Sequence, residues 1–247
     1  MNRRLILMAL LAFGATSSFA APEEGSVAER RKQQWAFTPD ETLPNVLILG
    51  DSISIGYTLQ VRALLEGKAN VFRPLKHEGA RGGENCSGTT KGVTSIERWL
   101  GDRKWDVIHF NFGLHDLKRV TEPGGEKISA DPQDPPQATV EKYAENLDVI
   151  VKKLKASGAR LVFANTTPVP EGSKNPFRDP ADPPRYNAAA ARIMQENGVR
   201  VNDLFALCQP QLDKIQQSKN VHFNNEGNRV LAEQVAKVIE EELNARR

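Results

Sequence analysis

The stretch Asn45-Val-Leu-Ile-Leu-Gly-Asp-Ser-Ile-Ser54 sets the pattern for the whole chain. Its apolar run ends at Gly50 and is typical of a strand buried on both faces of a sheet. The residues from Tyr57 to Leu65 then predict a helix. Ser52 therefore lies in a strand-to-helix turn, near the positive end of the helix dipole, where developing negative charge is stabilised.

The alternation of apolar strands and helices continues along the chain. Further strands are predicted at 70–73, 107–112, 160–164 and 199–201, and further helices at 90–99, 139–157, 186–196 and 225–243. This order predicts an α/β layered fold with a parallel sheet. Two proline-rich loops, 121–137 and 167–184, follow strand ends. We expect both to face substrate, because open α/β sheets bind ligands beyond the carboxyl ends of their strands.

The first twenty residues have the pattern of a signal peptide. A basic start, Arg3-Arg4, precedes an apolar run at 5–13 that is too short to span a membrane, and Ser18-Phe-Ala20 offers small residues to a signal peptidase. We expect cleavage after Ala20, which makes the protein secreted or periplasmic with no membrane span afterwards. An uncleaved anchor is the less favoured alternative.

The remaining chain divides into a polar segment at 21–42, expected to be a tether or a peripheral segment, and a single domain at 43–247. The whole chain of 247 residues has 33 basic and 31 acidic residues. Removal of residues 1–20 takes away two arginines and no acid, which leaves 31 residues of each sign. The general basic footprint of a nucleic-acid-binding protein is therefore absent, and no nucleic-acid partner is expected.

A serine nucleophile needs a base, and the chain offers four histidines. His109 lies inside a predicted strand and His77 in a loop without special context, whereas His222 directly precedes the last helix. The Gly-x-Ser-x-Gly elbow of α/β-hydrolases is not met, because Ser54 stands at its last position. Dinucleotide, Walker A and His-Glu-x-x-His motifs are absent from the sequence, so no cofactor and no metal are expected.

The order of four blocks resembles the SGNH (GDSL-type) hydrolases, over most of the chain from Asn45 to about Ile239. The blocks are Gly50-Asp-Ser-Ile-Ser54, Cys86-Ser-Gly-Thr-Thr90, Gly113-Leu-His-Asp116 and Val221-His-Phe-Asn-Asn-Glu-Gly227. The resemblance implies a flavodoxin-like three-layer α/β/α sandwich. It also implies Ser52 as nucleophile, His222 as base, and the backbone N–H groups of Ser52 and Gly88 as oxyanion donors.

Two positions depart from the family pattern. His115 stands where the family has an oxyanion-binding Asn; a neutral imidazole has one N–H and can serve the same role, with its tautomer fixed by Asp116 or a backbone carbonyl. The alternative is a hole with only two backbone donors. Lys219 stands where the family has the acid of the triad. The partner of His222 is then a carbonyl, a carboxylate elsewhere, or none. Asp51 and Asp116 are supporting candidates.

The resemblance implies hydrolysis of O-acyl esters, and the extended similarity favours secreted bacterial esterases that act on acylated carbohydrates. We expect a small acyl group, acetyl above all, on a sugar or polysaccharide, because the proline-rich loops are polar. Trp99 and Trp105 are candidates for stacking on sugar, although burial in the core is the more common role. The alternatives are a lipid esterase or thioesterase, and a catalytically silent carbohydrate-binding domain. Cys86 and Cys208 either pair in an oxidising compartment or are separate buried thiols.

Overall fold

The computed structural model describes residues 35–77 and 82–245, so the predicted signal peptide lies outside the described residues. One all-parallel sheet has the strand order β2-β1-β3-β4-β5. This order confirms the flavodoxin-like α/β fold. Each predicted strand is present, with ends that differ by at most two residues. The strands are β1 (Asn45–Leu49), β2 (Asn70–Phe72), β3 (Val107–Phe110), β4 (Arg160–Ala164) and β5 (Arg200–Asn202).

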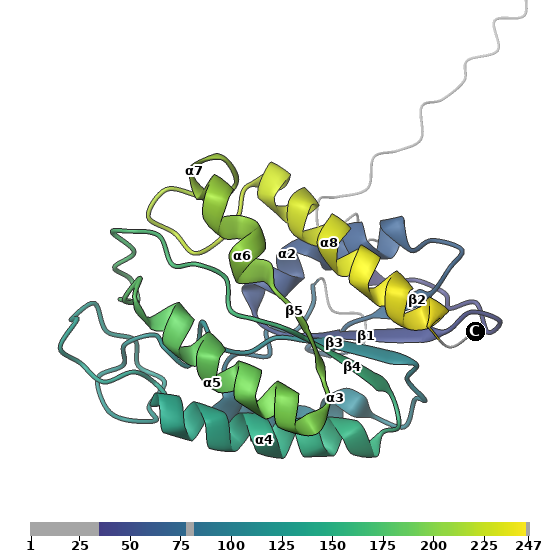
Figure 1. Cartoon of the computed structure of the whole chain (residues 1–247), viewed down its shortest axis with the longest axis horizontal. Helices are drawn as coiled ribbons and strands as arrows, with labels where there is room; N and C mark the ends of the chain where they lie inside the picture. Colours follow the sequence, from purple (N-terminus) through teal and green to yellow (C-terminus); the bar gives the residue numbers. More distant parts are fainter. Residues whose placement is uncertain (1–34, 78–81, 246–247) are drawn as a thin grey trace, which may run out of the picture.

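Helices cover both faces of the sheet and make the three layers (Figure 1). α2 and α8 pack together on one face, and α3, α4 and α5 pack side by side on the other. The bounds are α2 (Ser52–Leu64), α3 (Thr89–Leu100), α4 (Val140–Ala156), α5 (Asp182–Asn197) and α8 (Asn225–Asn244). All five predicted helices are present.

Two helices begin several residues earlier than the sequence pattern predicts. α2 begins at Ser52 because the Asp51 carboxylate caps it by accepting the backbone N–H of Ile53. α5 begins at Asp182, with Pro183 and Pro184 in its first turn, where proline is tolerated because it lacks an N–H that would have no partner there. The end of the second proline-rich loop is therefore helical.

Three short elements were not predicted: α6 (Leu204–Cys208), the 3₁₀ helix η1 (Gln209–Gln211) and α7 (Leu212–Ile215). Each has at most five residues, too few to show a helical period. Tertiary packing stabilises such short turns, because helices of this length are not stable alone. They carry the chain from β5 to the loop that holds His222.

The core lies between the sheet and its two helical layers. The four predicted stripe positions of α4, which are Leu147, Ile150, Val151 and Leu154, are all fully buried. Strand residues of β1 and β3 are buried on both faces, as their continuous apolar runs predict. His109, in the middle of β3, is fully buried, and burial lowers its pKa to about 3. A neutral core histidine results.

The strand order reverses at β1, which has β2 on one side and β3 on the other. Helices leave β1 and β3 toward opposite faces there, so a crevice opens beyond the carboxyl ends of these two strands. Ser52 follows β1 and His115 follows β3. The long loops gather at this end of the molecule, opposite the C-terminus (Figure 1).

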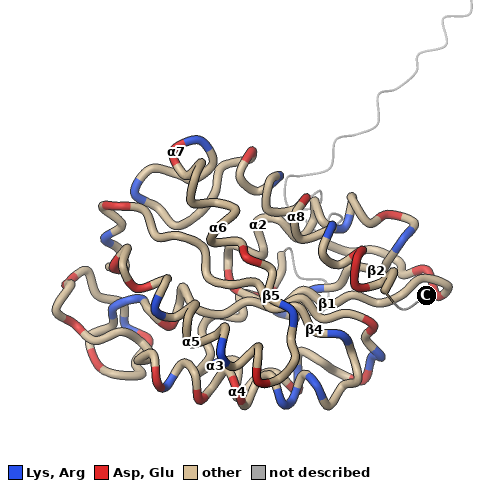
Figure 2. The backbone as a smooth tube through the Cα atoms, in the orientation of Figure 1, with Lys and Arg blue, Asp and Glu red and all other residues tan. Residues whose placement is uncertain are grey.

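Residues 35–42, the described part of the predicted polar segment, contact the edge of the sheet. The Phe37 ring lies 5.0 Å from that of Phe72 in β2, and Asp40 exchanges two hydrogen bonds with Asn70. Basic and acidic residues are interspersed along the backbone tube (Figure 2). Among the described helices, none is long and apolar enough to cross a membrane.

Cys86 and Cys208 are both buried free thiols, so they do not pair.

Candidate active site

The turn that carries Ser52 is built from the residues before it. Gly50 has φ +151°, in a region that side chains rarely adopt, and a Cβ there would lie 2.8 Å from the Ser54 hydroxyl. Asp51 then caps α2 from a fully buried position. Ser52 becomes the first helical residue, and among the described residues no acceptor takes its backbone N–H. That N–H is available to a negatively charged ligand.

A buried arginine holds this turn from below. The Arg73 guanidinium donates to the carbonyl of Gly50, to the carbonyl of Asp51 and to the hydroxyl of Ser54, and a further pair of bonds goes to the Glu84 carbonyl. Arg73 is 6% exposed. Its many bonds to backbone acceptors make the turn rigid without placing a side chain in the crevice.

The loop before α8 presents His222 to the crevice. Val221 and Phe223 are buried on either side of it, so the alternation along this extended segment turns His222 outward. Asn224 caps α8 by accepting the backbone N–H of Gly227. The carbonyl of His222 accepts the backbone N–H of Gln217, which closes the loop.

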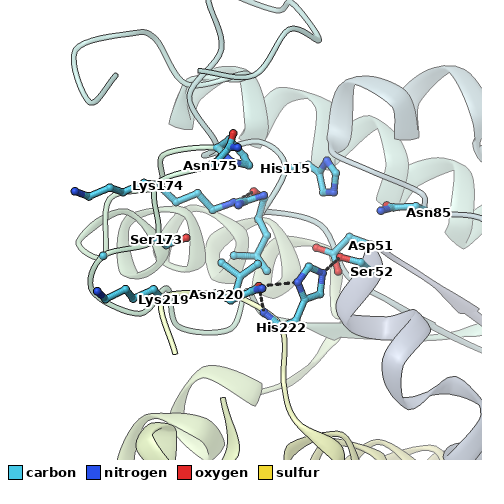
Figure 3. A pocket seen from close by; sticks show the side chains of 15 residues that line it. Asp51, Ser52, Asn85, His115, Ser173, Lys174, Asn175, Lys219, Asn220 and His222 are labelled. Atoms are coloured by element: carbon cyan, nitrogen blue, oxygen red, sulfur yellow. Dashed lines mark hydrogen bonds between the residues drawn. The ribbon is translucent and has the colours of Figure 1, made fainter. Parts of the chain in front are cut away.

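His222 joins Ser52 to Asn220 (Figure 3). His222 Nε2 lies 2.8 Å from the Ser52 hydroxyl, and His222 Nδ1 lies 2.7 Å from Asn220 Oδ1. The backbone N–H of His222 donates to the same Asn220 oxygen, at 3.0 Å. Because the backbone N–H of His222 donates to it, this Asn220 atom is the amide oxygen, which can only accept. His222 Nδ1 must therefore donate, so Nδ1 carries the imidazole proton. Nε2 then has the lone pair that a general base needs toward a serine hydroxyl.

The partner of His222 is therefore an amide oxygen. Lys219, at the family's acid position, has a left-handed backbone with φ +55° and is absent from the hydrogen bonds of the imidazole. The neighbouring Asn220 takes the orienting place instead. None of the three alternatives from the sequence, a backbone carbonyl, a distant carboxylate or no partner, describes this contact.

Gly88 caps α3 and is tied to the block after β3. The Asp116 carboxylate accepts both the backbone N–H and the hydroxyl of Thr89, at 2.9 and 2.5 Å. A Cβ at Gly88 would lie 3.0 Å from Asp116, so only a glycine leaves this contact undisturbed. Among the described residues no acceptor takes the Gly88 N–H. Burial raises the pKa of Asp116 to about 6.

His115 projects toward the space over Ser52, beside Asn85 (Figure 3). Its Nδ1 lies 3.3 Å from Nζ of the buried Lys118. An ammonium group is only a donor, so Nδ1 accepts and the neutral ring carries its proton on Nε2. Burial and the charges of Lys118, Arg178 and Lys91 lower the pKa of His115 to about 3, which keeps the ring neutral. Lys118, rather than Asp116 or a carbonyl, sets this tautomer.

Two adjoining cavities share His115. The first cavity, of about 610 Å³, is also lined by Ser52, Asn220 and His222. The second cavity, of about 490 Å³, is lined by Gly88 and Lys118 as well as His115. Residues 172–176 and 178 of the second proline-rich loop line the first cavity, and Gly124 and Glu126 of the other loop line the second. Both loops thus border the candidate site.

The two tryptophans take no part in this site. Trp99 stacks on Phe112, and the Trp105 indole donates to the Leu100 carbonyl; both are at most 5% exposed. Burial in the core, the more common role of the two that the sequence allows, is therefore the one observed, and neither ring is available to stack on sugar. Within the described residues, no group of three or more His, Cys, Asp or Glu could hold a metal ion.

Comparison with protein families gives one match. Residues 48–230 match the family model of the GDSL-like lipase/acylhydrolase family. The chain belongs to this family. It is an ester hydrolase of the SGNH type, as the four blocks imply. A comparison with curated proteins found no relative by sequence.

Three solved structures, one described as a lipase/acylhydrolase and two as acetyl xylan esterases, have a similar fold. The lipase/acylhydrolase from Enterococcus faecalis matches with a TM-score of 0.63 at 17% identity, over 80% of this chain and 96% of its own. The acetyl xylan esterase AlAXEase matches with a TM-score of 0.61 at 14% identity, over 79% of this chain and 99% of its own. The acetylxylan esterase Axe2 from Geobacillus stearothermophilus matches with a TM-score of 0.58 at 16% identity, over 78% and 93% of the two chains.

Sequence reasoning missed four residues around the candidate site: Asn220, Lys118, Arg73 and Arg178. Asn220 lies two residues before His222, and an Asn side chain typically accepts a hydrogen bond from the residue two positions later, as in an Asx turn. Lys118 is three residues from His115. These two short spacings could have indicated both contacts from the sequence. No such spacing indicates the contacts of Arg73 and Arg178, because their partners are distant along the chain.

Proposed function

We propose that this SGNH hydrolase removes small acyl groups, acetyl above all, from carbohydrate esters, with Ser52 as nucleophile and His222 as general base. The observation that carries the proposal is the 2.8 Å contact between the Ser52 hydroxyl and His222 Nε2, the nitrogen that Asn220 leaves unprotonated. A serine hydroxyl next to such a lone pair is an activated nucleophile.

The reaction proceeds through an acyl-enzyme. The Ser52 oxygen forms a bond to the acyl carbon while its proton passes to His222 Nε2, and the imidazolium is stabilised by Asn220. The carbonyl oxygen becomes an oxyanion, bound by the backbone N–H groups of Ser52 and Gly88 and by Nε2–H of His115. The C–O bond to the alcohol then breaks, and the alcohol leaves with the proton from His222. Water, deprotonated by His222, attacks the acyl-enzyme and releases the acid.

Two features support a carbohydrate ester over a lipid. The first cavity is lined mainly by polar and charged side chains, among them Asn85, Ser173 and Asn175, which favour a hydroxyl-rich substrate. Two of the solved structures with this fold are described as acetyl xylan esterases. Asp51 and Asp116 act as supports, since one caps α2 and the other fixes the start of α3.

The decisive experiment compares the purified protein with Ser52→Ala. We expect the native protein to hydrolyse p-nitrophenyl acetate and to release acetate from acetylated polysaccharides, and Ser52→Ala to lose roughly 10⁴-fold or more in kcat. Equal slow rates of both proteins would mean a catalytically silent carbohydrate-binding domain. A p-nitrophenyl ester series that favours long acyl chains would instead show a lipid esterase.

We also propose that the enzyme acts outside the cytoplasm. The supporting feature is the basic and apolar leader at residues 1–20. In a bacterial host, mass spectrometry of the exported protein should give an N-terminus at Ala21. Recovery of the full-length chain from the cytoplasm alone would contradict export.

A further inference from the structure

The cavity over Ser52 has an uneven charge. Lys174, Arg178 and Lys219 line it, whereas Asp51 is the one carboxylate among its described lining residues. Asp51 lies beneath the nucleophile, and burial raises its pKa. Along the described chain as a whole, basic and acidic residues are interspersed (Figure 2). The lining of this cavity therefore has more cations than carboxylates, although the chain as a whole is nearly balanced.

Arg178 is the most informative of these cations. It is 7% exposed, and its Nε donates to the Leu114 carbonyl at 2.7 Å. Among the described residues, no acceptor takes either of its terminal Nη groups, and no carboxylate forms an ion pair with it. Asp51 acts on it only at longer range. A buried cation without a direct counter-ion is costly, and this one lines the substrate cavity.

The shape of this guanidinium selects its ligand. Because Nε is held by Leu114, the two Nη groups remain as a pair at the other end of the plane. Two parallel N–H donors match the two oxygens of a carboxylate in a bidentate pair. The Leu114 carbonyl lies in the same block as His115, so the guanidinium is held in a fixed relation to the oxyanion side of the site.

Lys174 and Lys219 lie on exposed loops at the cavity, and their charges attract anionic substrates at long range. Neither Lys174 nor Lys219 has an ion pair among the described residues. The stem of Lys219 passes over Gly172, where a Cβ would lie 3.1 Å from Cγ of the lysine. This contact joins the loop of Lys219 to the loop of Lys174. Cations around a concave site raise the local concentration of anionic substrates.

We propose that the substrate of this enzyme is an O-acylated acidic carbohydrate, whose carboxylate is bound by Arg178 next to the scissile ester. This inference rests on the proposed function and narrows its substrate class from carbohydrate esters to esters of uronate-containing carbohydrates. Arg178 serves as the specificity determinant, and Lys174 and Lys219 attract the polyanion.

Matched polymers provide the test. An O-acetylated polyuronate is compared with the same polymer after its carboxyl groups have been reduced to neutral alcohols, at equal acetyl content. We expect kcat/KM for acetate release to be at least tenfold higher on the acidic polymer at low ionic strength, and the ratio to fall as salt is added. An equal or lower value on the acidic polymer overturns the inference. An equal preference for an acetylated sulfated polymer overturns the assignment of a carboxylate.

Variants locate the effect. Arg178→Gln and the double variant Lys174→Gln/Lys219→Gln should each lower the acidic-to-neutral ratio several-fold, whereas Lys237→Gln on α8, away from the cavity, should keep it. Should Arg178→Gln fail to fold, the double variant, with its exposed positions, still decides the result. A ratio unchanged by the double variant and by every folded Arg178 variant refutes the inference.

The two proposals fail in different ways. Loss of all ester hydrolysis in Ser52→Ala, together with equal rates on the acidic and reduced polymers, supports the proposed function and removes the inference. Hydrolysis that does not depend on Ser52 removes the proposed function, whatever the polymer preference.

Discussion

Asn220 Oδ1 accepts two hydrogen bonds from one residue, the imidazole Nδ1–H and the backbone N–H of His222. This pair of bonds fixes both the plane of the ring and its tautomer. A carboxylate would fix the same tautomer and also stabilise the positive charge that the ring gains in the transition state. The Asn220 amide fixes the tautomer as a carboxylate would, but it stabilises the positive charge of the ring only through its dipole.

The first prediction concerns this contact. Asn220→Ala removes the acceptor, so the ring can rotate and adopt the other tautomer, and kcat on p-nitrophenyl acetate should fall by about 10–100-fold. Asn220→Asp should retain activity and shift the acid limb of the pH–rate profile to higher pH, because a carboxylate favours the imidazolium. The measurement is kcat/KM between pH 5 and 9. A role limited to loop structure would lower activity in both variants without moving the profile.

A second prediction tests the imidazole that replaces the family's amide. His115→Ala should lose roughly 10²–10³-fold in kcat, the usual loss for one oxyanion donor. His115→Asn should recover most of this loss, since its amide also donates an N–H. Lys118→Met should fall between the two, because the Nε2–H tautomer of His115 is then no longer fixed. Undiminished rates in both His115 variants would exclude an oxyanion role.

The third prediction concerns Arg73 beneath the nucleophile turn. Arg73→Met leaves the buried Glu84 carbonyl without a donor, and the Gly50 carbonyl keeps only the backbone N–H of Cys86. The change should lower the free energy of unfolding by about 3 kcal/mol. Urea denaturation measures the loss. Arg192→Met, at an exposed position on α5, is the matched control and should change stability little. Similar stabilities of the two variants would show that water replaces the guanidinium without cost.

A fourth prediction follows from the buried Asp116, whose pKa of about 6 lies above its ordinary value of 3.8. Between these values the folded protein holds a proton that the unfolded chain has lost, so the free energy of unfolding falls as pH rises from about 4 to 6. The contribution of this group is at most about 3 kcal/mol. Asp116→Asn should remove it.

Urea denaturation across this pH range checks the effect as a difference between the native protein and the variant. The difference is needed because two histidines have the opposite effect over the same pH range. The pKa values of His109 and His115 are both lowered to about 3, so the unfolded chain binds more protons at these residues and the free energy of unfolding rises with pH. Asp102→Asn, at an exposed position, is the control. A difference between native protein and Asp116→Asn that does not change with pH would show that Asp116 is ionised throughout.

The sequence by itself determined the fold and the two ends of the candidate catalytic pair. Continuous apolar runs fixed the buried strands, the period of α4 fixed its packing face, and the turn after β1 placed Ser52. These features are local, because burial and turn formation are read from neighbouring residues. The four blocks then located Gly88, His115 and His222 in the correct order, without their contacts.

The tertiary structure decided how these residues are held and charged. Asn220 and Lys118 set the tautomers of His222 and His115, and such tautomers depend on which group a ring nitrogen meets in space. Arg73 and Arg178 reach acceptors far along the chain, so no spacing in the sequence announces them. The sequence left two roles open for Trp99 and Trp105, the core and sugar stacking, and the structure places both in the core. Only packing decides whether an aromatic ring faces the core or a cavity.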